Sequence, residues 1–162
     1  MYCSFFGHRD YGNDSEHCLT ETIEKLIFTA NVDVFYVGNK DAFDRAVHRA
    51  LRMLKDKYPY IKVYIVLDSV SPFTDDRLNE DEREYLEELA DFEFLVPDGI
   101  ENVPKRYAMS HRNDWMIKEC DFAVVYCLYS GSNTQKYIDK LNKSEKTVVN
   151  IAELTSEADC PF

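Results

Sequence analysis

The sequence lacks several features that mark special classes of protein. Its five cysteines are an odd number without a Cys-x-x-Cys pair, which argues against a disulfide scaffold and against a zinc ribbon. No apolar run approaches the roughly 18 residues that a membrane span needs. The start, Met1 to Gly7, has no basic segment of a secretory signal. We therefore expect a protein of the reducing cytoplasm, without a membrane partner, a metal or a cofactor.

Positive charge is also scarce. The chain has 19 Lys and Arg against 30 Asp and Glu, which gives a net charge of -11. Binding to the phosphates of nucleic acids rests on basic patches, so we do not expect DNA or RNA as the main partner. The same acidic field repels anionic membranes. Any anionic ligand must then bind at a local positive site.

Short apolar runs alternate with amphipathic segments along the 162 residues. Strands are expected at 2–6, 32–37, 61–67, 92–96, 122–127 and 147–151. Helices are expected at 19–30, 41–57, 79–89 and 104–119, and a last helix ends at 141. Regular alternation predicts parallel strands with helices on both faces of the sheet. We expect one α/β domain over residues 1–162, a Rossmann-like three-layer fold with a mainly parallel sheet, whose last residues, about ten, form a tail.

Such sheets bind ligands beyond the carboxyl ends of their strands, which singles out the loops after Phe6, Val37, Leu67 and Cys127. The first loop begins Gly7-His8-Arg9. Its glycine permits a sharp turn, and the planar fork of arginine suits phosphate. A solvated loop is the alternative.

The second loop, Gly38-Asn39-Lys40, precedes a helix whose free N–H groups can hold an anion. Asp41 is a candidate cap of that helix. For Asp44 two roles are open: to accept a hydrogen bond from a sugar hydroxyl of the ligand, or only to complement the helix dipole. His48 and Arg52, four residues apart, are expected on a solvated face.

A basic stretch lies in the helix that begins near Pro104. Lys105, Arg106, His111 and Arg112 fall within eight positions of an acidic chain. They indicate an anionic ligand, or else a solvated face that pairs with surplus carboxylates.

The fourth loop, residues 130–134, is rich in small hydroxyl side chains. Ser130, Gly131 and Ser132 can present donors to a phosphate. Asn133 or Thr134 can instead be a helix N-cap.

Three of these segments resemble one family. The opening Cys3-Ser4-Phe5-Phe6-Gly7-His8-Arg9 resembles the C-x-F-x-G-H-R start of the YpsA-like branch of the SLOG superfamily, which also holds DNA-processing protein A and the Lonely Guy phosphoribohydrolases. Residues 38–51 are similar to the G-G-A-x-G-x-D-x-x-A-H-x-A-L stretch of DNA-processing protein A, with matches at Gly38, Asp44, His48, Ala50 and Leu51. Met109 to Asn113 with Met116 is similar to the M-x-x-R-K-x-x-M helix of the Lonely Guy enzymes, whose catalytic arginine Arg112 would match.

The chain departs from the Lonely Guy pattern at one decisive position. The glutamate of their P-G-G-x-G-T-x-x-E motif falls on Tyr137 when Thr134 is placed on the threonine. Cleavage of a ribosidic bond needs a carboxylate. Asp44, Asp114 and Asp139 are the carboxylates that could replace the glutamate, and the choice among them stays open. Asp139 is two residues beyond Tyr137 and rotated away on the helix, so Asp44 is favoured over it.

The resemblance implies a domain that binds or senses a nucleotide or nucleotide-derived ligand. The alternatives are a nucleoside monophosphate phosphoribohydrolase, with Arg112 and Asp44 as catalytic candidates, and a partner-binding protein that has lost the site. Whether the chain is an enzyme, and whether it forms a homo-oligomer, stays open. The candidate ligand-binding residues are Gly7, His8, Arg9, Gly38, Asn39, Asp44, Arg106, Arg112, Asn113, Ser130, Gly131, Ser132, Asn133 and Thr134.

Overall fold

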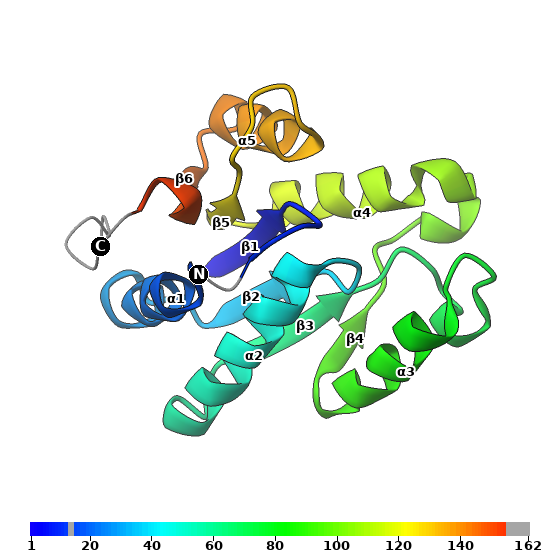
Figure 1. Cartoon of the computed structure of the whole chain (residues 1–162), viewed down its shortest axis with the longest axis horizontal. Coiled ribbons are helices and arrows are strands. Elements are labelled where there is room, and N and C mark those ends of the chain that lie inside the picture. The colour runs from blue at the N-terminus through cyan, green and yellow to red at the C-terminus, as the bar shows by residue number, and fades with distance from the viewer. Residues whose placement is uncertain (13–14, 155–162) are drawn as a thin grey trace.

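Strands and helices alternate along residues 1–12 and 15–154, which the computed structural model describes (Figure 1). The strands are β1 (Tyr2–Gly7), β2 (Val34–Val37), β3 (Lys62–Val66), β4 (Glu93–Leu95), β5 (Phe122–Tyr126) and β6 (Thr147–Asn150). The helices are α1 (Glu16–Ala30), α2 (Ala42–Lys57), α3 (Glu80–Glu88), α4 (Lys105–Glu119) and α5 (Asn133–Lys143). Each expected element is present, so the sequence prediction of an α/β fold is confirmed. Most of the expected C-terminal tail, residues 155–162, lies outside the described residues.

All six strands of the sheet are parallel, in the order β4-β3-β2-β1-β5-β6. The chain builds outward from β1 to β4 and then crosses to the other side of β1 to form β5 and β6. The strand order therefore reverses between β1 and β5. In parallel sheets this switch point leaves a crevice at the carboxyl ends of the strands.

Successive side chains of the central strands point to opposite faces of the sheet. Phe5 and Phe35 join the core beneath α1 and α2, to which α3 adds Leu86. Phe6 and Tyr36 face the other way and pack beneath α4 and α5. The sheet is thus covered on both faces, as the near-continuous apolar strands predict.

Local sequence fixes where the helices begin. Asn79 caps α3 in a capping box, because its side chain accepts from the N–H of Glu82 while the Glu82 carboxylate accepts from the N–H of Asn79. Asp41 caps α2 by accepting from the N–H of Asp44. No helix in the described part of the chain is long and apolar enough to cross a membrane.

Candidate functional site

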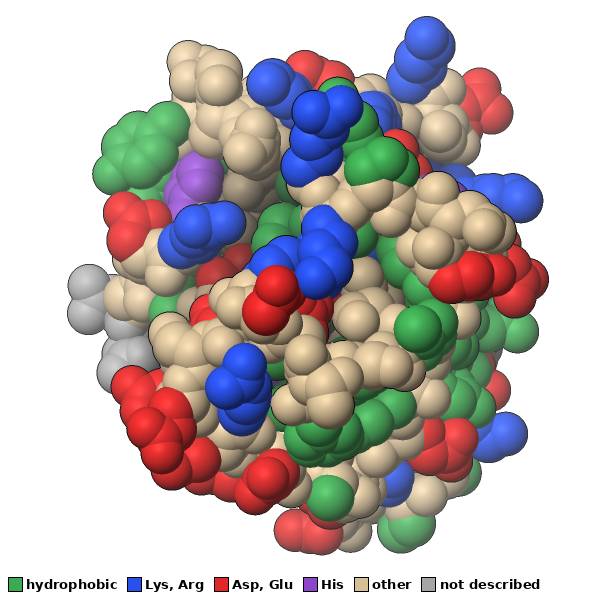
Figure 2. Space-filling model, turned by 90° about the vertical axis from the view of Figure 1, so that its right-hand side faces the viewer, with side chains coloured by type: hydrophobic (Ala, Val, Ile, Leu, Met, Phe, Trp, Pro, Cys, Tyr) green, Lys and Arg blue, Asp and Glu red, His purple; other side chains and the backbone are tan. Residues whose placement is uncertain are grey.

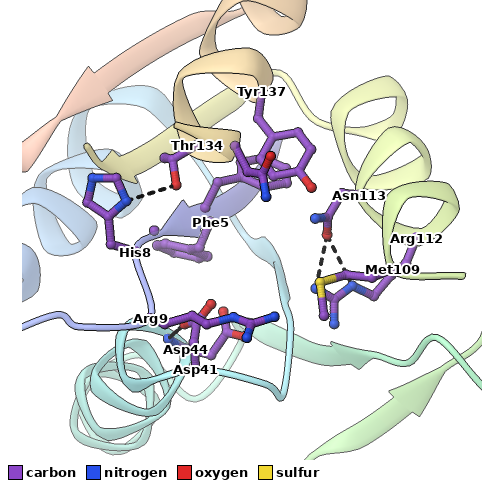
Figure 3. A pocket seen from close by; sticks show the side chains of 13 residues that line it. Phe5, His8, Arg9, Asp41, Asp44, Met109, Arg112, Asn113, Thr134 and Tyr137 are labelled. Atoms are coloured by element: carbon purple, nitrogen blue, oxygen red, sulfur yellow. Dashed lines mark hydrogen bonds between the residues drawn. The ribbon is translucent and has the colours of Figure 1, made fainter. Parts of the chain in front are cut away.

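A pocket of about 220 Å³ lies at the switch point, beyond the carboxyl end of β1 (Figure 3). We call it the switch-point pocket. The loops after β1 and β2, the start of α5 and the middle of α4 meet there. Its lining residues are Phe5, Phe6, Gly7, His8, Arg9, Asp41, Asp44, Met109, Arg112, Asn113, Asn133, Thr134 and Tyr137.

Arg112 is the main cation of this pocket, and only 5% of its surface is exposed to solvent. The side-chain oxygen of Asn113 accepts from its Nε at 3.1 Å and from Nη2 at 3.0 Å. Nη1 donates to Asn39 Oδ1 at 3.5 Å. Among the described residues Arg112 forms no ion pair with a carboxylate. A buried guanidinium held only by neutral amides retains a strong preference for an anion.

Gly38, the first residue of the loop after β2, allows the side chains of Asp44 and Arg112 to approach each other. A Cβ added to Gly38 would lie 2.7 Å from Asp44 Oδ2 and 3.1 Å from both Nη1 and Nη2 of Arg112. No side chain fits in this space. The glycine is therefore required by the packing of these two side chains, since its backbone does not adopt the left-handed conformation that favours glycine.

Two carboxylates stand at the start of α2. Asp44 is buried, and its Oδ2 accepts from the N–H of Lys40 at 3.0 Å. Burial raises the pKa of Asp44, and the charge of Arg112 opposes that rise. Burial and the neighbouring Asp44 also raise the pKa of Asp41. Sequence reasoning treated Asp41 only as a helix cap, but it caps the helix and lines the pocket.

His8 closes the opposite side of the pocket. Its Nε2 lies 2.8 Å from the N–H of Leu128, which can only donate, so Nε2 carries no proton. The proton of the neutral ring then sits on Nδ1, which faces Thr134 Oγ1 at 3.5 Å. Figure 3 shows this contact on the left, with Arg9 extending toward Met109 and Arg112 above Asp41 and Asp44.

The loop before α5 contributes less than the sequence suggests. Asn133 and Thr134 line the pocket, whereas Ser130, Gly131 and Ser132 are not among its lining residues. Ser132, rather than Asn133 or Thr134, is the N-cap of α5 and accepts from the N–H of Gln135 at 3.1 Å.

Gly7 lines the pocket for a packing reason. A Cβ at this position would lie 2.3 Å from ring atoms of Phe43, so a larger residue cannot be accommodated. The sequence predicts a sharp turn at this glycine, in a loop that binds the ligand. The structure gives it a role in the packing of α2 against β1 as well.

His48 is not on a solvated face, so that expectation is wrong. The ring is fully buried, and Nε2 lies 2.9 Å from the carbonyl oxygen of Gly38, which can only accept. Nε2 therefore donates, and Nδ1 accepts from the hydroxyl of Tyr85 at 2.6 Å. Burial lowers the pKa of His48 to about 3. A neutral histidine thus holds the loop at Gly38 in place, while Arg52 pairs with Asp91 at 3.1 Å.

Tyr137, on which the sequence resemblance places the Lonely Guy glutamate, lines the pocket with its ring 5.5 Å from that of Phe6. Asp139 is exposed and accepts from the amide of Gln135 at 3.0 Å. Of the three candidate carboxylates, only Asp44 lines the pocket; Asp139 lies outside it, and so does Asp114, which pairs with Lys140.

A second cavity, a groove of about 800 Å³, adjoins the switch-point pocket. We call it the basic groove. Arg9, Asp41 and Met109 line both cavities. Figure 2 shows Lys and Arg side chains gathered near the middle of this face of the molecule, with acidic side chains beside them. The groove's cations are Arg9, Lys40, Arg45, Arg77, Lys105 and Arg106, against the three acids Asp41, Asp68 and Glu82.

Arg106, which the sequence assigned to the ligand site, lines this groove and not the pocket. Arg77 and Asp68 were missed, although the loop after Leu67 was singled out by its place at the sheet edge. Both residues form ion pairs: Arg77 pairs with Asp75 at 2.5 Å, and Asp68 pairs with Lys40 at 3.5 Å. No cluster of three or more metal-ligating side chains is found in residues 1–12 and 15–154.

Two solved structures share this fold. DNA processing protein A (DprA) from Streptococcus pneumoniae has a TM-score of 0.62 and 16% identity, with 91% of this chain and 48% of that chain covered. DNA processing protein A from Helicobacter pylori, described for its single-stranded DNA binding mode, has a TM-score of 0.60 and 15% identity, with 91% of this chain and 63% of that one covered. This chain therefore spans between about half and two thirds of their length. No family model matches the sequence, and no curated protein does.

The fold is that of DNA processing protein A, which supports the sequence resemblance at the level of the fold. The expectation that nucleic acid is not a partner is overturned by this finding, because a protein of the same fold is described as binding single-stranded DNA. The net charge of -11 was misleading because it averages over the whole surface. Six cations of an acidic chain are concentrated in one groove.

Proposed function

We propose that this protein binds a phosphorylated nucleotide or nucleotide-derived ligand in the switch-point pocket, with a phosphate on Arg112. The observation that carries the proposal is the burial of Arg112 without an ion pair among the described residues. A protein does not desolvate a guanidinium without compensation. Asn113 and Asn39 supply only neutral oxygens, and the nearby carboxylate of Asp44 forms no ion pair with Arg112.

The surroundings of Arg112 suit a nucleotide. Phe6 and Tyr137, whose rings lie 5.5 Å apart, form an apolar wall of the pocket against which a base can pack, and Met109 adds a further apolar lining residue. Asn113 and Thr134 add polar groups that can hydrogen-bond to a base or a sugar. The pocket also lies at the edge where open parallel sheets bind ligands.

The sequence motifs and the fold together lead us to place the chain in the SLOG superfamily as a single domain over residues 1–162, within the YpsA-like branch. The DNA-binding neighbour supports a ligand built from nucleotides. The leading role in this proposal is binding or sensing, because the sequence resemblance aligns Tyr137 with the hydrolytic glutamate, and Tyr137 lines the pocket.

The test is calorimetric titration of the purified protein with the four common nucleoside monophosphates. We expect Arg112→Gln to weaken binding about tenfold or more, since a charge-assisted contact to phosphate is worth roughly 1.5–3 kcal/mol. Lys143→Gln, in the last turn of α5, removes the same charge away from the pocket and is the matched control. Thermal melts of each variant establish that it folds. Equal affinity of a folded Arg112→Gln variant removes Arg112 from the site.

Cleavage of the N-glycosidic bond is the second candidate function, and the placement of Asp44 beside Arg112 favours it. A carboxylate there can stabilise positive charge on a ribose or activate water. The assay is release of free base from a panel of nucleoside monophosphates. The binding role predicts no turnover near an ordinary ~10 s⁻¹. Such turnover, if abolished by Asp44→Asn, establishes the hydrolase instead.

A further inference from the structure

We propose that the ligand carries two or more phosphates in series, of which one binds Arg112 in the switch-point pocket and the next ones lie in the basic groove. This inference rests on the proposed function and names the ligand class more narrowly. Two sources have this chemistry, a nucleoside polyphosphate and a 5′-phosphorylated strand of nucleic acid.

The two cavities adjoin each other in the structure. Arg9, Asp41 and Met109 belong to the lining of both, so a ligand that passes these three side chains enters the groove directly from the pocket. The pocket has about 220 Å³, below the roughly 300–1,000 Å³ of ordinary small-molecule sites. The groove has about 800 Å³. A ligand larger than the pocket must therefore extend into the groove.

The charges of the groove select phosphates for that extension. Lys40, Arg77 and Lys105 are paired with Asp68, Asp75 and Asp76. The remaining three cations, Arg9, Arg45 and Arg106, form no ion pair with any described carboxylate.

Two of these three arginines are held by aromatic rings. Arg45 lies over the ring of Tyr85 at 4.0 Å, and Arg106 lies over that of Tyr107 at 4.7 Å. Stacking orders a guanidinium and leaves its edge N–H groups free to bind an anion in bidentate fashion. Asp41 and Glu82 also line the groove, but neither forms an ion pair with these three arginines among the described residues. In a chain with 30 acidic residues, three arginines without an ion pair around one groove indicate a polyanionic ligand.

The experiment compares ligands that differ only in phosphate number or in chain length. The protein is titrated with AMP, ADP and ATP, and with 5′-phosphorylated oligothymidylates of one, two and four nucleotides. We expect at least about tenfold tighter binding in one or both series, of ADP over AMP or of the dinucleotide over the mononucleotide, because each added phosphate gains charge-assisted contacts. If only the oligothymidylates gain affinity with length, the source of the phosphates is a nucleic acid strand; if only ADP and ATP do, it is a nucleotide.

The Arg106→Gln variant connects that gain to the groove. It should reduce the ratio of ADP to AMP affinity, or of dinucleotide to mononucleotide affinity, about tenfold. Lys143→Gln should leave both ratios as in the parent protein. Binding of the monophosphate without any gain in either series overturns this inference and leaves the proposed function standing. Failure of every nucleotide to bind overturns the proposed function and this inference with it.

Discussion

Replacement of Gly38 by alanine perturbs the centre of the site with one methyl group. The added Cβ would lie 2.7 Å from Asp44 Oδ2 and 3.1 Å from two nitrogens of Arg112, closer than such contacts allow. Neither side chain can yield freely. Asp44 is bound to the N–H of Lys40, and Arg112 is bound to Asn113. The methyl group must therefore displace the guanidinium or shift the loop.

The expected cost follows from overpacking of a well-packed interior, about 1–3 kcal/mol in the free energy of unfolding. For a chain of this size each kcal/mol lowers Tm by roughly 2–4 °C. Displacement of Arg112 should also weaken nucleotide binding about tenfold or more, because the phosphate contacts depend on its position. Both quantities are measured on one preparation, by circular dichroism melts and by calorimetric titration.

Gly12→Ala is the matched control. A Cβ at Gly12 meets no atom within 4 Å, and its backbone does not need glycine. We expect a change in unfolding free energy of at most about 0.5 kcal/mol and no change in affinity. A Gly38→Ala protein with the Tm and the affinity of the parent would refute the close approach of Asp44 and Arg112 on which the site depends.

Three further predictions concern charge and protonation in and near the site. Burial and Asp44 raise the pKa of Asp41 to about 8, so Asp41→Asn, which keeps a good N-cap, should leave the affinity for anions unchanged at about pH 6.5 and increase it several-fold at about pH 9 in calorimetric titrations; equal affinities of parent and variant at the higher pH contradict this. Asn113→Asp keeps an oxygen that accepts from Arg112 but adds a negative charge that neutralises the guanidinium, so affinity for phosphate should fall about tenfold in a protein that still melts cooperatively. Unchanged affinity would show that the charge of Arg112 is not used. The pKa of His48 is lowered to about 3 from an ordinary value near 6.5, so its contribution to stability is complete above pH 6.5 and decreases as pH falls, by up to about 1.4 kcal/mol per pH unit. Melts between pH 7.5 and 4.5 should show a steeper loss for the parent than for His48→Gln, and parallel curves would contradict the buried neutral ring.

Much of the fold is readable from the sequence because hydrophobic periodicity and helix caps are local signals. The apolar run at Phe122–Tyr126 predicts a strand buried on both faces, and the structure places it next to β1. Asn79 followed by three acidic residues predicts the start of α3. The ends of strands were less accurate, since strand ends depend on pairing with neighbours that are distant in the sequence.

The candidate site was predictable in its position but not in its protonation or packing. The rule for parallel sheets brings His8, Gly38 and Thr134 to one edge, and the structure brings them there. The burial of His48 against the carbonyl of Gly38 was not predictable. The sequence does not tell whether a histidine on a helix faces solvent or the interior until the position of the neighbouring loop is known. Arg77 reaches the groove only through the tertiary fold.

The most direct test of the account is the crystal structure of the protein soaked with a mixture of nucleoside mono-, di- and triphosphates. We predict ligand density in the switch-point pocket, with phosphate oxygens at hydrogen-bonding distance from the guanidinium of Arg112. Further phosphates should extend past Arg9 toward Arg106. Nucleotide density elsewhere on the surface, with Arg112 still bound only to Asn113 and Asn39, would contradict it.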